Sequence, residues 1–413
     1  MTVHELSRPN GTRVVVSPAP RQPGGRLSPD DLVERARRVA AIAAVHADDV
    51  DREGRYPAEA MAAAKAEGLL GVMAPAAFGG EAASLSRVAD VCYTLGRACA
   101  STAMVYAMHQ VKVACVIRHG IGSAWHEAFI RTLVENQLLL ASSTTEGQGG
   151  GNVRSSEAPV QRSGDRISLE RAASVISYGE QADVVVTTAR RAADAAASDQ
   201  VLIVFMRDDY SLEPTLSWDT LGMRGTCSAG FTLRASGGAA QILPAAYEII
   251  HTQSMVPTAH LLWSSAWAGV AAAAVERARR YVRKAARTGG GDLPPSAPYL
   301  TRANASLRAV RALIATMLDR YEAIAGDPEA LSAIDFQSAI SLLKVDASEL
   351  AVASVMSALR TCGLSGYRND SDVSIGRHLR DVLSAPIMIN NDRILANVAS
   401  AALLSEVATS IRD

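Results

Sequence analysis

Hydroxyl and glycine residues crowd one short stretch of the chain, residues 141–152, which reads Ala-Ser-Ser-Thr-Thr-Glu-Gly-Gln-Gly-Gly-Gly-Asn. Hydroxyl groups can both donate and accept hydrogen bonds, and glycine lets backbone N–H groups come close to a ligand. A second stretch, residues 173–183, reads Ala-Ser-Val-Ile-Ser-Tyr-Gly-Glu-Gln-Ala-Asp. Because the Lys of a phosphate-binding P-loop is missing, a planar hydrogen-bonding cofactor suits this pattern better than a nucleoside triphosphate.

The elements that must position these stretches change in type twice along the chain. Residues 1–27 are polar and rich in Pro, Gly and Arg, which predicts a disordered arm. A Ser-Pro-Asp-Asp start and apolar residues at three- and four-residue spacing then predict a helical domain over residues 28–137. Short apolar runs between turn residues predict a β domain over residues 138–246. Helical spacing returns over residues 247–413, which predicts a C-terminal helical bundle.

Composition and charge exclude several classes of protein. The 413 residues are 48% hydrophobic and 20% charged, with a formal net charge of −1, so nothing attracts the chain to nucleic acid or to an acidic membrane. The five cysteines are scattered without a Cys-x-x-Cys pair, which argues against a metal site and a disulfide framework. The most hydrophobic span, residues 259–275, is Ala-weighted and runs into charged residues, so we expect a buried helix there and no membrane span. No secretory leader is visible, and we expect a cytoplasmic protein.

Several short sequences stand in the same order as the motifs of one enzyme family. They are Pro75 with Phe78-Gly79-Gly80, Thr145-Glu146 before the glycines, Val175-Ile176-Ser177-Tyr178-Gly179, Leu221-Gly222-Met223-Arg224-Gly225-Thr226, Gly363-Leu364-Ser365-Gly366-Tyr367, and Arg380-Asp381. On these residues the chain resembles the acyl-CoA dehydrogenase superfamily. The resemblance implies an α+β, mostly α fold with an N-terminal α-helical domain, a central β-barrel domain and a C-terminal four-helix bundle. It also implies a homo-oligomer, a tetramer, with helix 259–287 at or near a subunit interface.

The resemblance further implies a bound flavin, FAD in most relatives, and it carries a set of contact residues onto this chain. Around the isoalloxazine ring these are Ser142, Thr144, Thr145, Gly151, Val175 and Ser177, with Thr145 and Ser177 at the N5 and O4 positions. Elsewhere on the cofactor they are Arg283, Arg287, Gly363, Gly366, Asn391 and Arg393.

The bundle helix departs from the family's FAD-binding pattern Tyr-x-x-x-Arg-x-x-Phe-Gly. Tyr281 and Gly289 match it, but Ala285 and Thr288 stand in place of its Arg and Phe. A neighbouring Arg can take the phosphate-binding role after a small shift, and a solvated basic helix end is the other interpretation of these cations. FMN, or reduced flavin delivered by a reductase, is therefore the alternative to FAD.

The position that decides the reaction also departs from the family. Counted from Arg380, the catalytic Glu of acyl-CoA dehydrogenases would stand at Ile389, and the second location used by some members is Ala259, beside His260. Removal of an α-proton needs a positioned base, so the family's default reaction, α,β-dehydrogenation of an acyl thioester, lacks its carboxylate. A branch that hydroxylates with reduced flavin and O₂ often carries His one position earlier, where this chain has Met388.

Two further residues are candidates for the missing catalytic group. Asp392 is the nearest acid, with helix capping as its alternative role, and His109 lies on an Ala- and Val-rich helix, where a hydrogen-bonded core histidine is the commoner case. Three functions stay open: a dehydrogenase of a CoA- or carrier-protein-linked substrate that works with an electron-transfer flavoprotein, a monooxygenase that works with a flavin reductase, and an inactive flavin-binding homologue. We expect no metal, and we predict that the ring lies against residues 142–146 and 175–178 with Ile389 on its substrate side.

Overall fold

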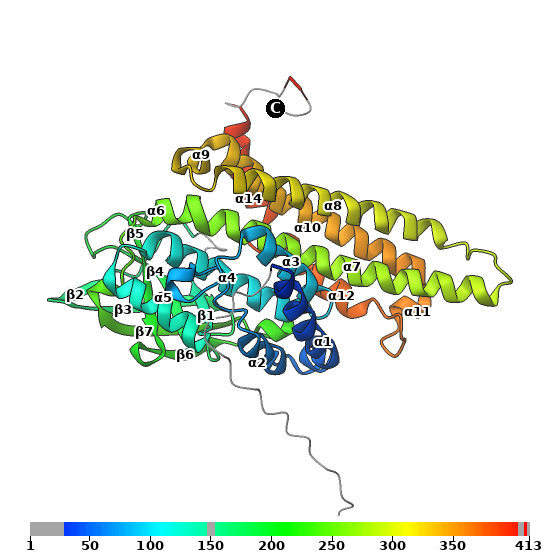
Figure 1. Cartoon of the computed structure of the whole chain (residues 1–413), viewed down its shortest axis with the longest axis horizontal. Coiled ribbons are helices and arrows are strands. Elements are labelled where there is room, and N and C mark those ends of the chain that lie inside the picture. Colours follow the sequence, from blue (N-terminus) through cyan, green and yellow to red (C-terminus); the bar gives the residue numbers. More distant parts are fainter. Residues whose placement is uncertain (1–28, 147–152, 404–408, 411–413) are drawn as a thin grey trace, which may run out of the picture.

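Helices fill the first part of the chain in the computed structural model, which describes residues 29–146, 153–403 and 409–410. They are α1 (Pro29–Glu53), α2 (Ala58–Ala66), α3 (Leu85–Gly96), α4 (Ala100–Gly120) and α5 (Ala124–Asn136). α1 begins at Pro29, as the sequence predicts, whereas the predicted arm 1–27 lies outside the described residues. α4 is buried along most of its length, because small and apolar residues occupy most of its positions, and it lies at the centre of the molecule (Figure 1).

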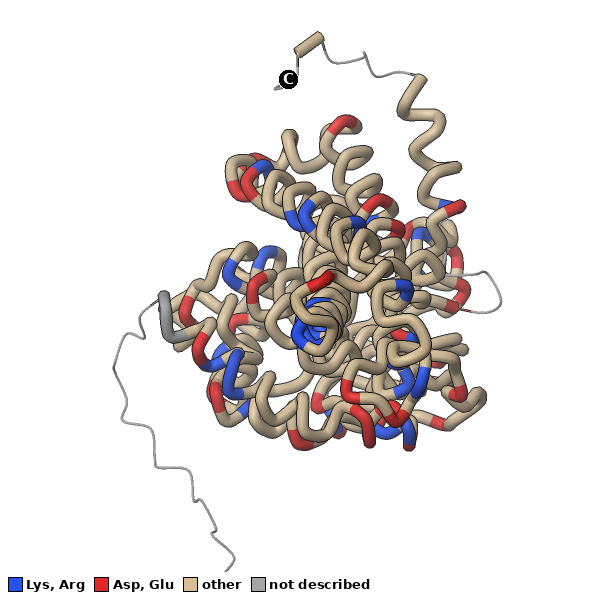
Figure 2. Tube along the Cα trace, turned by 90° about the vertical axis from the view of Figure 1, so that its right-hand side faces the viewer, with Lys and Arg blue, Asp and Glu red and all other residues tan. Residues whose placement is uncertain are grey.

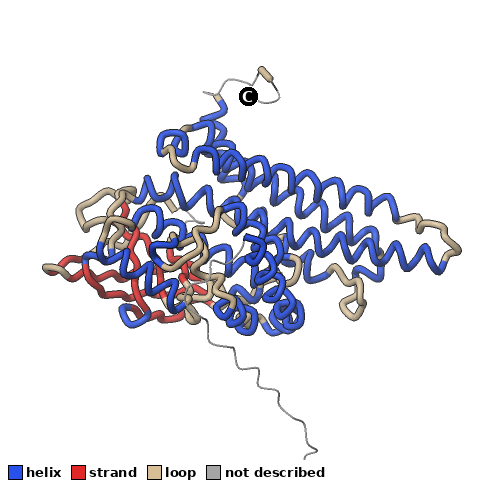
Figure 3. Tube along the Cα trace, in the orientation of Figure 1, coloured by secondary structure: helices blue, strands red, loops and turns tan. Residues whose placement is uncertain are grey.

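The strands that follow form two sheets in place of one continuous sheet. β1 (Leu140–Ser143), β4 (Val184–Arg190) and β5 (Gln200–Met206) make the first sheet, and β2 (Gln161–Ser163), β3 (Arg166–Ile176), β7 (Ala229–Gly238) and β6 (Tyr210–Leu216) make the second, in these spatial orders. β1 pairs with β4 in parallel, while β4 and β5, like the neighbours in the second sheet, are antiparallel. β4 and β5 are almost entirely buried, whereas β3 alternates over much of its length. Both sheets lie in the same half of the molecule (Figure 3).

The rest of the described chain is helical. After α6 (Tyr247–Ile250) and a π-helical turn, η5 (His251–Met255), come the long helices α7 (Val256–Thr288), α8 (Ala297–Ile324) and α10 (Ile334–Cys362). The shorter helices are α9 (Pro328–Ser332), α11 (Leu364–Tyr367), α12 (Gly376–Val382), α13 (Ser384–Ile387) and α14 (Asn391–Ala402). α7, α8 and α10 run side by side, and α14 packs on α10 (Figure 1). The order of helices, central sheets and helical bundle confirms the expected fold class.

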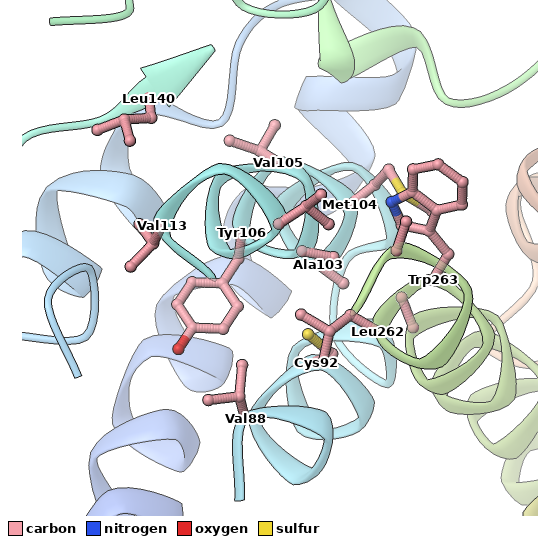
Figure 4. Close-up of a cluster of buried hydrophobic side chains, with 14 of the residues drawn as sticks. Val88, Cys92, Ala103, Met104, Val105, Tyr106, Val113, Leu140, Leu262 and Trp263 are labelled. Atoms are coloured by element: carbon pink, nitrogen blue, oxygen red, sulfur yellow. The ribbon is translucent and has the colours of Figure 1, made fainter. Parts of the chain in front are cut away.

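α7 joins the bundle to the N-terminal helices, because it packs on α3 and α4 as well as on α8 and α10. At its crossing with α3, Gly269 faces Gly96, and a Cβ at Gly269 would lie only 2.3 Å from the Tyr93 carbonyl oxygen. Figure 4 shows the neighbouring core, where Trp263 of α7 lies beside Met104 of α4. The Ala-rich first half of α7 is therefore a buried helix, as the sequence predicts. None of the described helices is long and apolar enough to cross a membrane.

One junction connects the bundle to both other parts of the molecule. The guanidinium of Arg380, on α12, donates to the carboxylate of Asp51 on α1, with 2.9 Å between Nη1 and Oδ1. The neighbouring Asp381 accepts the backbone N–H of Met223, between β6 and β7, at 2.7 Å. The two backbones come so close that a Cβ at Gly222 would lie 2.1 Å from the Arg380 carbonyl oxygen. Arg380 and Asp381 are adjacent in sequence but bind different partners, and together they hold three segments in place.

Candidate functional site

The two hydroxyl-bearing stretches of the sequence meet in the structure. The hydroxyl of Ser174, near the end of β3, donates to Oγ1 of Thr145, which follows β1, at 3.2 Å. An isolated antiparallel bridge between Glu146 and Ala173 adds a backbone link at the same place. The stretches that carry the predicted ring contacts Thr145 and Ser177 are therefore in direct contact.

Partly exposed hydroxyl groups line this meeting point. We call them the hydroxyl edge, and its residues are Ser142, Thr144, Thr145, Ser174 and Ser177. Oγ of Ser142 and Oγ1 of Thr144 lie 3.4 Å apart, and Oγ of Ser177 lies 2.7 Å from Oγ of Ser228. Because each hydroxyl can donate and accept, these groups keep hydrogen-bonding capacity for a ligand. The hydroxyl edge therefore fits the polar rim of an isoalloxazine ring.

A β-bulge shapes the end of β3 beside the hydroxyl edge. The register between β3 and β7 shifts at Ser174 and Val175, and Val175 is 37% exposed. Beyond the bulge, Tyr178 has a positive φ of 43°, and its hydroxyl donates to the Leu140 carbonyl at 3.0 Å. This bond fixes the end of β3 against β1, and the predicted contact Val175 is exposed beside Ser174 of the hydroxyl edge. The predicted contact Gly151 lies outside the described residues.

Glu146, the acid next to Thr145, points into the protein. Its carboxylate accepts a hydrogen bond from the Ser156 hydroxyl at 3.1 Å and lies 3.3 Å from Nη1 of Arg171. Arg171 is fully buried, and burial lowers its pKa to about 10 although Glu146 opposes the shift. Glu146 is thus committed to an internal ion pair and is not placed to take a proton from a substrate.

The turn at the predicted base position is strained. Ile389 and Asn390 have positive φ angles of 61° and 60°, and a β-branched residue such as Ile rarely adopts this conformation. Ile389 and Met388 are partly buried against the core, while Ile387 is 75% exposed. The surface at the base position is therefore apolar.

Asp392 does not cap the helix that follows this turn. The N-cap of α14 is Asn390, whose Oδ1 accepts the N–H of Asp392 at 3.0 Å. Asp392 is exposed in the first helical turn, where the helix dipole favours a negative charge. The capping alternative for Asp392 is therefore wrong by two residues, and its exposed carboxylate belongs to the start of α14.

Asn391 is a structural link between α14 and α10 in this structure, where a cofactor contact was expected. Its Oδ1 accepts from Nζ of Lys344 at 2.6 Å, and its Nδ2 donates to Oγ of Ser348 and to Oε1 of Glu349, both at 2.9 Å. Burial lowers the pKa of Lys344 to about 8. Both ends of the amide are thus used inside the bundle, while the other predicted contact on this helix, Arg393, is partly buried.

His109, the second candidate base, belongs to the core. The Leu140 N–H donates to its Nδ1 at 3.0 Å, so Nε2 carries the proton and donates to the Leu70 carbonyl at 2.8 Å. Burial lowers the pKa of His109 to about 4, which keeps the ring neutral near pH 7. Both ring nitrogens are bonded to backbone groups, so His109 has no free nitrogen with which to exchange a proton with a substrate. Ala259, the second base location of the family, is buried in α7.

The remaining predicted cofactor residues gather at the far end of α7. A cavity of about 630 Å³ lies there between the last turns of α7 and the segment after α10. Its charged lining residues are Arg280, Arg283, Lys284, Arg287 and Asp372. Gly363, which has a φ of 54°, and Gly366 lie at the start of the same segment. Figure 2 looks onto this end of the molecule. Because cations outnumber acids around the cavity, it suits a phosphate group.

The structure does not bring the far-end cavity and the hydroxyl edge together within one chain. Figure 1 shows β1 and β3 in one half of the molecule and the end of α7 at the opposite end. Ala259 and Arg283 lie on the same helix, α7, and are about 36 Å apart at a rise of 1.5 Å per residue. The two groups of predicted contacts therefore cannot serve the same end of one cofactor in one subunit.

Sequence reasoning missed three residues that shape the hydroxyl edge. They are Ser174, Ser228 and Arg171. Ser174 stands inside the hydroxyl-bearing stretch, so its residue type was a usable signal. Arg171 reaches Glu146 only through the pairing of distant segments, and nothing in its neighbourhood along the chain indicates that contact.

Comparison with known proteins identifies the family. The model of the acyl-CoA dehydrogenase N-terminal domain matches residues 29–134, and that of the C-terminal domain matches residues 255–404, together more than half of the chain. Cyclohex-1-ene-1-carbonyl-CoA dehydrogenase of Geobacter metallireducens is 24% identical over 365 residues, which cover 86% of this chain and 92% of that protein.

Solved structures share the fold. FMN-bound TdsC from Paenibacillus sp. A11-2, a dibenzothiophene monooxygenase, matches with a TM-score of 0.79 and 18% identity over 92% of this chain and 98% of that one. Butyryl-CoA dehydrogenase from Megasphaera elsdenii matches with a TM-score of 0.77 and 18% identity over 92% of this chain and all of that one. The chain belongs to the acyl-CoA dehydrogenase family and is a flavin-dependent oxidoreductase.

Proposed function

We propose that this protein uses reduced flavin and O₂ to place one oxygen atom on a small substrate. The observation that carries the proposal is the absence of a carboxylate at both base positions, which hold Ile389 and Ala259. Removal of an α-proton requires a base within hydrogen-bonding distance of that proton. Glu146 is paired with Arg171, and Asp392 is exposed at the start of α14, so neither replaces the missing base.

The residues of the hydroxyl edge fit a flavin ring, and we assign its binding to them. When bound, reduced flavin supplies the two electrons with which O₂ is divided between the substrate and water. Ser142, Thr144, Thr145 and Ser177 would hold the polar rim of the ring, and the exposed Val175 would contact its face. The apolar side chains of Met388 and Ile389 would exclude water from the substrate side and so limit the unproductive loss of oxygen as hydrogen peroxide.

We assign FAD as the cofactor, shared between two copies of the chain. The far-end cavity supports this assignment, because its cations outnumber its one acid and guanidinium groups bind the negatively charged oxygens of a diphosphate. Since that cavity and the hydroxyl edge lie far apart in one chain, Arg283, Arg287 and the segment of Gly363 and Gly366 would serve the cofactor of a neighbouring copy. The mass of the flavin released from purified protein distinguishes FAD from FMN.

α,β-Dehydrogenation of an acyl thioester is the second candidate function. The observation in its favour is the match of 86% of this chain to a CoA-thioester dehydrogenase. It predicts a CoA- or carrier-protein-linked substrate and an electron-transfer flavoprotein as partner, whereas the monooxygenase predicts a flavin reductase.

Anaerobic mixing of the flavin-loaded enzyme with acyl-CoA separates the two functions. We expect that cyclohex-1-ene-1-carbonyl-CoA and butyryl-CoA leave the oxidised flavin spectrum of the wild type unbleached, and that the photoreduced enzyme is reoxidised by O₂ without an added acceptor. Bleaching of the wild-type flavin by either thioester would overturn the proposal.

Two variants test the base position itself. Ile389→Glu restores a carboxylate there, and we expect it to gain bleaching by acyl-CoA. Ile387→Glu places the same charge on an exposed residue of the same segment and serves as the matched control. If the two variants behave alike while both remain folded and flavin-loaded, position 389 does not face the substrate.

A further inference from the structure

A group of buried basic side chains lies behind the hydroxyl edge and has no part in the proposed oxygen chemistry. It consists of Lys112 on α4, Arg171 on β3 and His251 in η5, which we call the inner basic cluster. All three side chains are buried. The cluster borders the hydroxyl edge, because Glu146 follows Thr145 in the chain and lies 3.3 Å from Arg171.

Contacts around Met255 bring the cluster together. Nζ of Lys112 lies 3.6 Å from Sδ of Met255, and the hydroxyl of Tyr247 lies 3.6 Å from the same sulfur. The ring centroids of Tyr247 and His251 are 5.7 Å apart. Burial lowers the pKa of Lys112 to about 8, and the guanidinium of Arg171 acts in the same direction. Segments α4, α6 and η5 therefore converge on Met255, while α4 also packs on β1, and β1 packs on β3, which carries Arg171.

The two cations of the cluster have more hydrogen-bonding capacity than the protein uses. Lys112 is 2% exposed, and the thioether of Met255, a weak acceptor, is its hydrogen-bond partner among the described residues. Arg171 donates from Nη1 to the backbone and hydroxyl of Thr188, while its buried Nε and Nη2 have no partner in the described part of the chain. Buried charges are normally paired and hydrogen-bonded, so these donors indicate a ligand.

The other groups at the cluster do not supply the missing negative charge. Burial raises the pKa of Cys115 to about 11 and raises the pKa of Tyr247 as well, so both are uncharged near pH 7. Burial lowers the pKa of His251 to about 3, and neighbouring cations act in the same direction, so its ring is neutral. Glu146 balances the guanidinium and leaves the ammonium of Lys112 without a carboxylate partner among the described residues.

We propose that the inner basic cluster binds an oxyanion of the substrate, a carboxylate or a phosphate ester, through Lys112 and Arg171. Ammonium and guanidinium groups both donate to oxyanions, and a guanidinium fork can hold two oxygens of one group. The neutral ring of His251 adds a polar contact. This inference rests on the proposed function, because it gives the substrate of the flavin reaction an anionic group, held next to the hydroxyl edge.

Equilibrium binding to the flavin-loaded enzyme tests the inference without turnover. The probes are benzoate, hexanoate and inorganic phosphate, with benzamide and hexanamide as uncharged analogues, each added at constant ionic strength. The readouts are the flavin absorbance spectrum and the thermal unfolding midpoint. We expect saturable changes with at least one oxyanion and none with the amides; a carboxylate response points to an acid substrate and a phosphate response to a phosphate ester.

Lys112→Met is the test variant, and Lys65→Met, which removes a half-exposed cation on α2, is its matched control. Met keeps the length of the buried side chain and removes the unpaired charge, so we expect Lys112→Met to fold and to melt above the wild type when no oxyanion is present. We expect its oxyanion affinity to fall about tenfold or more, equivalent to about 1.4 kcal/mol, while Lys65→Met keeps the wild-type affinity.

Two results would overturn the inference. One is an absence of oxyanion binding, or equal binding of acids and amides, in the wild type. The other is a folded, flavin-loaded Lys112→Met variant that binds the probes as the wild type does. Neither result bears on the oxygen chemistry. Conversely, bleaching by acyl-CoA would refute the monooxygenase proposal and would leave the oxyanion titration unchanged.

Discussion

Replacing His109 by Gln tests whether this residue stabilises the fold or takes part in catalysis. In the structure its ring joins α4 to the start of β1 through Leu140 and to the Leu70 carbonyl. Gln is uncharged and suits a helix, but it cannot reproduce both contacts. We expect a loss of about 1–3 kcal/mol in the free energy of unfolding, the cost of one buried backbone group left without a partner.

The pH dependence gives a sharper signature. The folded pKa of His109 is about 4, below the usual 6.5, so the native state binds fewer protons than the unfolded state between these values. Stability from this group is present above pH 6.5 and is lost as the pH falls toward 4. Integrated from pH 7.5 to pH 5, the loss is about 2 kcal/mol. Between pH 7.5 and pH 5, the free energy of unfolding of His109→Gln should therefore fall by about 2 kcal/mol less than that of the wild type.

Urea unfolding at pH 7.5 and pH 5 measures the difference. Other buried histidines contribute to wild type and variant alike, so they cancel in the comparison. His46→Gln, which removes a partly exposed histidine from α1, is the matched control. We expect the flavin content of folded His109→Gln to equal that of the wild type. If wild type and variant lose equal stability between the two pH values, the structural role assigned to His109 is refuted.

Three further predictions use the same unfolding assay. Burial raises the pKa of Asp381 to about 6, so its stabilising contribution is present below its ordinary pKa and is lost as the pH rises through 6. Between pH 5 and 7.5 the free energy of unfolding of the wild type should therefore fall by about 1 kcal/mol more than that of Asp381→Asn. Equal losses in the two proteins would contradict the raised pKa. Asn391→Ala removes the oxygen that accepts from the buried ammonium of Lys344 at 2.6 Å, and it should lower the free energy of unfolding by about 2–3 kcal/mol. An unchanged free energy of unfolding would show that this hydrogen bond does not stabilise the fold. Gly269→Ala would place a Cβ 2.3 Å from the Tyr93 carbonyl oxygen, and it should lower the free energy of unfolding by about 1–3 kcal/mol. Gly326→Ala, where a Cβ would meet open space, is the control and should leave the free energy of unfolding unchanged.

The order of elements was predictable because its signals are local. Apolar spacing and turn residues along each segment indicate helix or strand without knowledge of the fold, and α1 begins at Pro29 as predicted. The hydroxyl-bearing stretches were predictable for the same reason, since residue type alone marks them. The contact between Thr145 and Ser174 confirms that those stretches meet.

Features that depend on pairing between distant segments were not predictable. The bulge at Ser174 and Val175 arises from the register with β7, and a regular two-residue alternation would not show it. Asn390, Asn391 and Asp392 are all good capping residues, so their types alone could not show which one caps α14. The structure shows that Asn390 is the cap, because its Oδ1 accepts the backbone N–H of Asp392.

The inner basic cluster is the clearest case of this limit. Lys112 and Arg171 are 59 residues apart in the sequence, and each looks ordinary beside its sequence neighbours. Their relation appears only when α4 packs against the sheets and η5. Sequence composition does not show whether a single residue is buried. Because both side chains are buried here, two common cations become a pair of charges that is unusual in a protein interior.

The junction at Arg380 and Asp381 holds the segment that carries the proposed base position, so side chains in this segment can be varied by protein engineering. The segment from Val382 to Asn390 is fixed before its start by the bonds of that junction to Asp51 and Met223, and after its end by the amide of Asn391. Side chains between these two fixed ends can be replaced while the joints that hold the three parts together stay intact. A combinatorial library restricted to residues 387–389 therefore samples chemistries on one unchanged scaffold.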